Sequence, residues 1–266
     1  MQKILRASVS IAWLFCCAFI FTQSCLPAAN AKSFAFTIRK FEDKRLESSA
    51  SESEEEQIKA LAARDLVILI DCSGSMATID CPARQSRWQW CCEQTLGLAN
   101  RGRDVFKSGV RVVAFATGQK VYKNVKSDGV SAIFRENPPL GCTNVALAIK
   151  RQFNDYLRRR ARPEDSQTVK PLLIAVITDG CFEKSFKAVQ STLSEYRQRL
   201  ISPSEVSIVF LQVGEDLPAN YMVKGLSAEA LNSGFDIVSS KTFSEFRKTG
   251  LTDALLEVVA AAPSQF

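Results

Sequence analysis

Continuous apolar runs alternate with amphipathic segments along most of this chain. Apolar runs typical of strands that are covered on both faces occupy residues 65–70, 110–118, 171–180, 205–214 and 235–240. Helical patterns lie between and after them, over residues 87–102, 143–157, 182–200, 226–234 and 252–261, and residues 121–134 offer material for short edge strands. This alternation predicts an α/β fold: a Rossmann-like three-layer sandwich with a mostly parallel central sheet flanked by helices.

The N-terminus has the layout of a secretory signal peptide. Lys3 and Arg6 precede an apolar stretch over residues 8–21, and the small-residue motif Ala29–Asn30–Ala31 follows. The stretch is short for a spanning helix, which needs about 20 residues. We therefore expect residues 1–31 to be cleaved and the protein to be exported, as a periplasmic, extracellular or envelope-associated protein. Membrane attachment is expected only if this segment stays uncleaved as an anchor, or if Cys25 carries a lipid.

Composition divides the rest of the chain. Residues 32–63 combine an N-terminal segment with a charged, serine-rich stretch that is typical of a linker. Residues 64–262 carry the α/β pattern and form the predicted domain, and residues 263–266 form a short C-terminal tail. This length is ample for one domain with a substantial core.

Charge and residue usage narrow the function classes. Loss of residues 1–31 lowers the formal net charge from +6 to +4. The one dense basic cluster, residues 158–162, is interpreted as a helix end followed by a solvated loop, and no aromatic residues interleave with it, so we expect no nucleic-acid partner. The chain contains no histidine, which excludes His-based zinc sites and Ser-His-Asp triads.

Small oxygen-bearing side chains follow three of the predicted strands. Asp71, Ser73 and Ser75 come after the first strand, Thr143 opens a helix, and Asp179 follows the apolar residues PLLIAVI (171–177). In open α/β sheets, ligands bind at the carboxyl ends of the strands. Two carboxylates and three hydroxyls suit a hard divalent ion such as Mg²⁺ or Mn²⁺, with room for a further anionic oxygen.

With these residues in place, the sequence resembles a von Willebrand factor A-type domain with a metal-ion-dependent adhesion site, of the small bacterial exported kind. The family motif DxSxS, then a threonine, then an aspartate is matched by Asp71-Cys72-Ser73-Gly74-Ser75, Thr143 and Asp179. The resemblance covers about residues 64–262.

The resemblance implies a role for each matching residue. Ser73 and Ser75 would bind Mg²⁺ or Mn²⁺ directly, and Asp71 directly or through water. Thr143 would coordinate the ion directly when a ligand is bound, and Asp179 through a bridging water. A glutamate or aspartate of a protein partner would fill the last position. The resemblance thus implies a binding module and not an enzyme.

Other interpretations compete with this one. Ser and Asp after strands are also common helix N-caps, and the ion could serve only the stability of an envelope scaffold. A phosphatase of the haloacid dehalogenase type also begins with an aspartate at a strand end, but Ser73 stands where such enzymes have a second carboxylate. Asp80 is interpreted as a loop residue, and Trp88 and Trp90 as core residues.

Four cysteines surround the expected metal site: Cys72, Cys81, Cys142 and Cys181. In an exported protein they are candidates for rim disulfides, and we expect at least one to form. Alternatively, they fill space beside the ion as small buried residues. A thiolate zinc site is a poor match, because soft sulfur would stand beside five hard oxygens.

Overall fold

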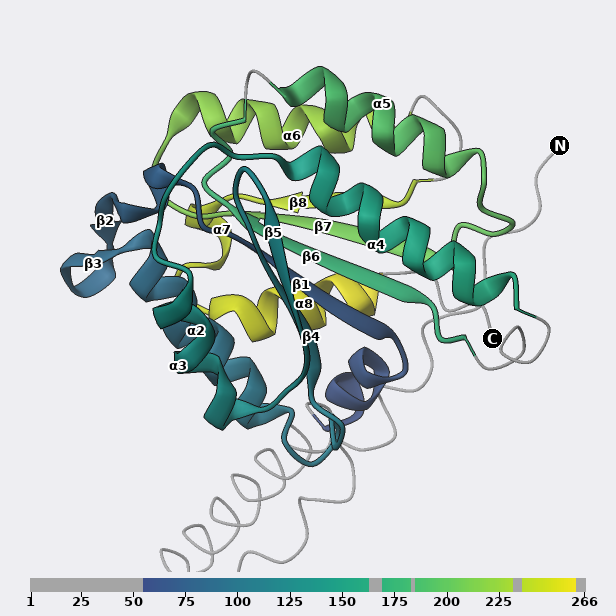
Figure 1. The fold of residues 1–266 in the computed structure, drawn as a ribbon, viewed down its shortest axis with the longest axis horizontal. Helices are drawn as coiled ribbons and strands as arrows, with labels where there is room; N and C mark the ends of the chain where they lie inside the picture. The colour runs from purple at the N-terminus through teal and green to yellow at the C-terminus, as the bar shows by residue number, and fades with distance from the viewer. Residues whose placement is uncertain (1–54, 163–168, 183–184, 232–235, 262–266) are drawn as a thin grey trace, which may run out of the picture. The chain divides into compact units, whose positions relative to one another are not determined.

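The computed structural model describes residues 55–162, 169–182, 185–231 and 236–261, which are drawn in colour in Figure 1. The predicted signal peptide with Cys25, most of the predicted linker and the C-terminal tail lie outside the described residues. No helix in the described part of the chain is long and apolar enough to cross a membrane.

A six-stranded sheet forms the centre of the domain (Figure 1). Its strand order is β5-β4-β1-β6-β7-β8. The strands are β1 (Asp65–Asp71), β4 (Val110–Phe115), β5 (Gln119–Val125), β6 (Leu172–Thr178), β7 (Val206–Gln212) and β8 (Val238–Lys241). A separate two-stranded sheet pairs β2 (Ile79–Cys81) with β3 (Gln85–Ser86).

The direction of β5 corrects the expected Rossmann-like, mostly parallel sheet: the sheet is mixed. β5 pairs antiparallel with β4, whereas the other neighbouring strands pair in parallel. Residues 116–118 alone connect β4 to β5, and the Ala116 amide donates to the Gly118 carbonyl at 2.8 Å. A parallel pair needs a crossover of a dozen residues or more, so this short turn enforces a hairpin.

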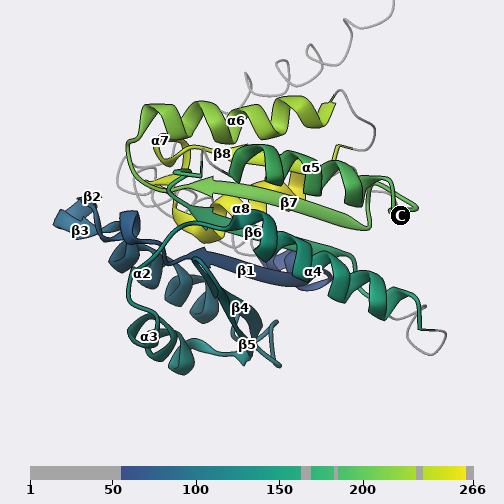
Figure 2. The same cartoon turned by 45° about the horizontal axis from the view of Figure 1, so that its top comes forward.

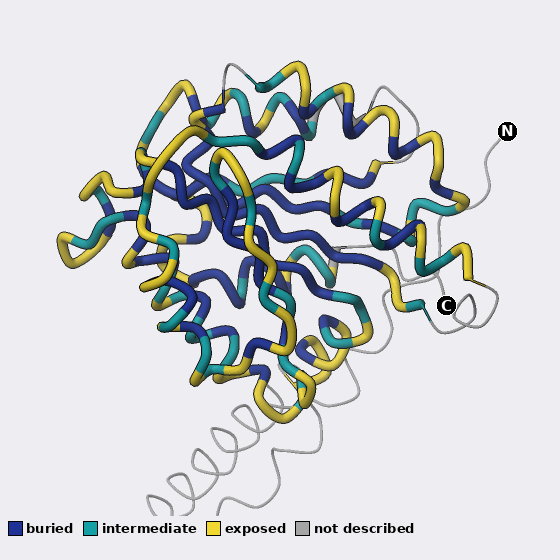
Figure 3. Tube along the Cα trace, viewed as in Figure 1, coloured by how far each residue is buried: buried dark blue, intermediate teal, exposed yellow. Residues whose placement is uncertain are grey.

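Helices cover both faces of the sheet (Figure 2). One face packs against α2 (Arg87–Arg101), α3 (Ser127–Glu136), α7 (Phe243–Phe246) and α8 (Gly250–Ala261), and the other against α4 (Val145–Arg160), α5 (Phe186–Arg197) and α6 (Leu217–Leu231). β1 serves both cores, because Ile68 and Ile70 lie in one cluster and Val67 and Leu69 in the other. Figure 3 shows the central strands as buried over most of their length. Burial on both faces explains why these strands read as unbroken apolar runs.

Local sequence accounts for the helix starts near the candidate site. Ser86 and Gln89 form a capping box at the start of α2. The Asn144 side chain accepts from the Leu147 amide at 3.2 Å and caps α4. Trp88 and Trp90 are both buried, which confirms their interpretation as core residues.

Some element boundaries differ from the predicted ones. The second half of the predicted edge-strand region is helix α3, and α6 begins well before the short helix predicted at residues 226–234. The described end of the predicted linker, residues 55–62, is helical, and its Ile58 and Leu61 belong to a core cluster.

Candidate functional site

Asp71 ends β1 and is fully buried. Its Oδ1 accepts a hydrogen bond from the Ser73 amide at 2.8 Å, and its Oδ2 accepts one from the Thr178 hydroxyl at 2.7 Å. Thr178 ends the neighbouring strand β6. Burial raises the pKa of Asp71 to about 6, although these two hydrogen bonds favour the charged form. The carboxylate is therefore fixed in orientation at the carboxyl edge of two adjacent strands.

The two serines of the DCSGSM segment lie next to each other. Ser73 Oγ and Ser75 Oγ are 3.2 Å apart. Ser75 lies in a short 3₁₀ helix, Gly74–Ala77, which follows directly after Ser73. The Gly74 amide donates to the Gly141 carbonyl at 3.1 Å, so this loop is bonded to the loop that leads to Thr143.

The loop before Thr143 is held by the turn between β4 and β5. Gly141 has φ +86°, and a Cβ at this position would lie 2.8 Å from Thr117 Oγ1. The Thr117 hydroxyl also accepts from the Cys142 amide at 3.2 Å. Only glycine combines this backbone conformation with so close an approach. Thr143 follows directly, between this anchored turn and the N-cap of α4.

Asp179 follows β6, is fully buried and belongs to an ion-pair network. Its Oδ2 accepts from Arg87 Nη1 at 3.0 Å, and its Oδ1 accepts from the Cys181 amide at 3.0 Å. Arg87 also donates to Asp80, with Nη2 2.6 Å from Asp80 Oδ2. Burial lowers the pKa of Arg87, but the two carboxylates outweigh burial and raise it above its usual value.

The three predicted hydroxyl ligands share one cavity of about 550 Å³. Ser73, Ser75 and Thr143 all line it, together with Gly141, Cys142, Gly180, Cys181, Phe182, Ser185, Asp216, Pro218, Ala219 and Met222. Asp71 and Asp179 are not among the lining residues. The loops that contribute the three hydroxyls are thus brought together at this cavity. Both carboxylates are buried behind its lining, Asp71 just before Ser73 and Asp179 just before Gly180.

The donor set suits a hard cation. It consists of oxygens only, and each carboxylate oxygen that accepts one hydrogen bond keeps a further lone pair. Within the described ranges, no group of three or more His, Cys, Asp or Glu side chains could hold a metal ion. A site here would therefore depend on the hydroxyls of Ser73, Ser75 and Thr143 beside the two carboxylates.

All six cysteines in the described part of the chain are free thiols in this structure, and the rim disulfide expected after export stays a prediction. Cys72 and Cys81 are buried, whereas Cys142 and Cys181 are exposed on the cavity wall. Although Cys181 as a whole residue is exposed, its thiol is partly shielded from water, and this desolvation raises its pKa to about 12, with Asp179 and Asp216 adding to the effect. The positions of these cysteines in the sequence did not predict which of them are buried and which are exposed.

Sequence reasoning missed the contribution of Arg87. An arginine at the first position of a helix ordinarily faces solvent, yet this side chain is only 7% exposed. One feature of the sequence indicated its burial: Arg87 directly precedes the buried Trp88, so the start of this helix lies against the core. Asp80, interpreted as a loop residue, lies in the strand β2 and holds this arginine.

Comparison with known proteins adds information on the fold. No family model and no curated protein matches the chain. A mutant of the PilB minor pilin from Streptococcus sanguinis is similar in structure, with a TM-score of 0.50 at 12% sequence identity, over 73% of this chain and 59% of the pilin. The chain thus covers less than two thirds of that protein, and the likeness shows the fold alone.

A second solved structure, the pilus adhesin RrgA from Streptococcus pneumoniae, aligns with a TM-score of 0.30 at 16% identity. This alignment covers 55% of this chain and 24% of the adhesin. A likeness at this level carries no argument about this chain.

Proposed function

We propose that this chain is an exported binding module of the von Willebrand factor A type, which uses a Mg²⁺ or Mn²⁺ ion to capture an acidic side chain of a protein partner. The main support is the 3.2 Å separation of the Ser73 and Ser75 hydroxyl oxygens on the wall of a cavity that Thr143 also lines. The bound ion would supply a Lewis-acidic position for a carboxylate from outside.

The chain's own residues have separate tasks in this proposal. Ser73, Ser75 and Thr143 present hydroxyls to the ion. The Ser73 amide and the Thr178 hydroxyl orient Asp71, whose buried carboxylate supplies negative charge to the site. The Arg87 guanidinium neutralises part of the charge on Asp179, so the loaded site keeps a need for one more anion.

Calorimetric titration with Mn²⁺ tests the metal site. The variant Ser73→Ala/Ser75→Ala should lose about tenfold or more in affinity, because replacing even an outer-shell partner of a metal site typically costs 10–100-fold. The matched control is Ser191→Ala/Ser194→Ala, which removes two exposed hydroxyls from α5. Absence of Mn²⁺ binding by the wild type, or equal affinity in all three proteins, would refute the site.

A peptide array tests the ligand. Each Glu- or Asp-containing peptide is paired with its Gln or Asn counterpart and probed with Mg²⁺ or EDTA. The proposal expects retention on acidic peptides only with Mg²⁺, and its loss in Thr143→Ala. Retention that is unchanged in EDTA would argue against a metal-bridged ligand. Hydrolysis of p-nitrophenyl phosphate by the protein would favour the phosphatase alternative.

A further inference from the structure

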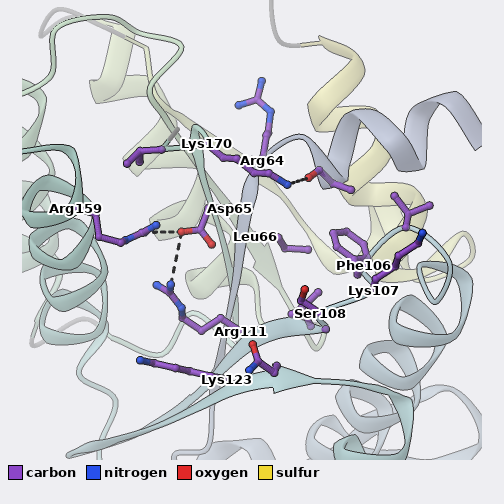
Figure 4. Close-up of a pocket in the computed structure, with 16 residues that line it drawn as sticks. Arg64, Asp65, Leu66, Phe106, Lys107, Ser108, Arg111, Lys123, Arg159 and Lys170 are labelled. Carbon is purple, nitrogen blue, oxygen red and sulfur yellow. Dashed lines mark hydrogen bonds and ion pairs between the residues drawn. The ribbon is translucent and has the colours of Figure 1, made fainter. Parts of the chain in front are cut away.

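A second cavity of about 600 Å³ lies at the end of the sheet where β1 and β4 begin (Figure 4). Asp71 is at the other end of β1. The walls of the cavity come from the start of β1, the segment before β4, β5, the end of α4 and residues 169–170. This volume falls within the range of small-molecule sites, about 300–1,000 Å³.

The lining of this cavity is strongly basic. Among the described residues, it contains one acidic residue, Asp65, and six cationic ones: Arg64, Lys107, Arg111, Lys123, Arg159 and Lys170. The chain as a whole has a formal net charge of only +6, so the cavity gathers much of the excess positive charge in one concave place. A concave site with one sign of charge focuses the electric field and attracts counter-ions.

Two of the six cations are already neutralised by carboxylates. Arg159 Nη2 lies 2.5 Å and Arg111 Nη2 3.6 Å from Asp65 Oδ2, and Figure 4 shows both side chains directed toward this carboxylate. Asp155 completes the group, 3.2 Å from Arg111 and 3.4 Å from Arg159. Two lining arginines are thus neutralised by two aspartates, of which Asp65 also lines the cavity.

The other four cations have no carboxylate within ion-pair distance among the residues that the structure describes. Lys107 and Lys123 are exposed. The Lys170 ammonium donates to the Ala62 carbonyl at 2.8 Å, and Arg64 Nη1 to the Ser207 hydroxyl at 3.3 Å. Both of these acceptors are neutral. Burial lowers the pKa of Arg64, so this cation has lost water without gaining a counter-charge from the part of the chain that the structure describes.

We propose that this cavity binds a small polyanion that carries phosphate groups. Lys107 and Lys123 come from different segments and are directed to opposite sides of the cavity in Figure 4, and Lys170 and Arg64 come from two further segments. A ligand with several separated anionic groups would therefore meet these cations better than a single carboxylate. A phosphate group carries up to two charges and several acceptor oxygens, which suits ammonium and guanidinium donors together. Leu66, Val105 and Phe106 leave part of the lining apolar, where an organic portion of the ligand can pack.

The phosphate can come from a soluble compound or from a lipid headgroup, and the experiment separates these sources. Tripolyphosphate is titrated calorimetrically into the full chain in EDTA, at low and at physiological salt. Sedimentation with phosphatidylglycerol vesicles is compared with sedimentation with phosphatidylcholine vesicles. EDTA keeps the assay independent of the proposed metal ion, so failure of one proposal leaves the other standing.

The test variant is Lys107→Gln/Lys123→Gln, which breaks no ion pair among the described residues. The control is Lys187→Gln/Lys248→Gln, which removes two exposed lysines elsewhere and the same total charge. We expect the test variant to lose about tenfold or more in affinity for tripolyphosphate or for anionic vesicles, and the control to stay within about twofold, with weaker binding at higher salt. Equal losses in both variants, or no binding of either probe by the wild type, would overturn the proposal.

Discussion

The guanidinium of Arg87 lies 3.0 Å from a carboxylate oxygen of Asp179, although 92 positions separate the two residues in the chain. The side chains of Arg87 and Asp179 are 7% and 0% exposed, so both charges have lost most of their water. The pair ties the start of α2 to the loop after β6, and Asp80 extends the connection to β2. A structural ion pair therefore stands directly beside the proposed metal site.

Replacement of Arg87 by Met should destabilise the protein strongly. It leaves the fully buried Asp179 without its counter-charge, and breaking one side of a buried ion pair typically costs about 3–5 kcal/mol. Urea denaturation followed by tryptophan fluorescence or circular dichroism measures the change. Arg247→Gln serves as the control, because it breaks the exposed pair with Glu215 and should cost no more than about 1 kcal/mol. Equal losses in the two variants would show that the Arg87 pair contributes no more than a surface contact.

The raised pKa of Asp71 predicts a pH-dependent stability in the metal-free protein. Burial lifts the pKa from 3.8 to about 6 in the folded state, so the folded state binds this proton more tightly than the unfolded state does. The stabilisation from the proton is complete below about pH 4, and it is lost as the pH rises to about 6. A shift of about two units corresponds to roughly 3 kcal/mol.

Thermal unfolding in EDTA between pH 4 and 7 measures this effect as the difference between the wild type and Asp71→Asn. Carboxylates far from Asp71 are unaffected by this substitution, so the difference reports Asp71 and its electrostatic coupling to Asp179. The wild type should lose stability relative to Asp71→Asn as the pH rises through this window. Parallel curves of melting temperature against pH for the wild type and Asp71→Asn would contradict the raised pKa of Asp71.

Gly214 limits the space around Arg87. It has φ +93°, and a Cβ there would lie 2.4 Å from Arg87 Nε. Gly214→Ala should therefore both strain the backbone and displace the guanidinium, with a loss of about 1–3 kcal/mol. Gly97→Ala in α2 is the matched control, because its Cβ would meet nothing within 4 Å and should stabilise the helix by up to about 1 kcal/mol. We expect the denaturant midpoint to fall in Gly214→Ala and to rise in Gly97→Ala. An unchanged midpoint in Gly214→Ala would argue that Arg87 is free to move.

The strand pattern was predictable because burial on both faces leaves a simple trace in the sequence. The strand β6 reads LLIAVIT, and every one of its residues is buried. The places of Asp71 and Asp179 at strand ends followed from the same runs, since the polar residue after an apolar run marks where a strand ends. These features depend only on local order along the chain.

Two of the prediction errors concern local structure, whereas two further features depend on contacts between distant segments, which sequence order does not encode. The antiparallel direction of β5 was not predicted, because residues 116–118, which form the turn before it, lie inside the apolar run that predicts a strand over residues 110–118. Residues 127–134 were predicted as edge-strand material, but they belong to helix α3, whose Val130, Ile133 and Phe134 are buried. The Arg87 pair and the basic cavity, which includes Arg64 and Lys123, each join residues from several segments, so neither forms a motif that could be read along the chain.

Cysteine reactivity separates the two exposed thiols on the wall of the candidate metal cavity. Cys142 and Cys181 are both exposed, but the pKa of Cys181 is raised to about 12, so little of its reactive thiolate exists at pH 8. Iodoacetamide at pH 8 should therefore label Cys142 well before Cys181, and the buried Cys91, whose pKa is also raised by burial, last. Peptide mass spectrometry over time resolves each site. Cys142→Ser should remove the fast phase and Cys181→Ser should leave it unchanged, whereas fast labelling of Cys181 would mean that its thiol is not held beside Asp179 and Asp216 as the structure has it.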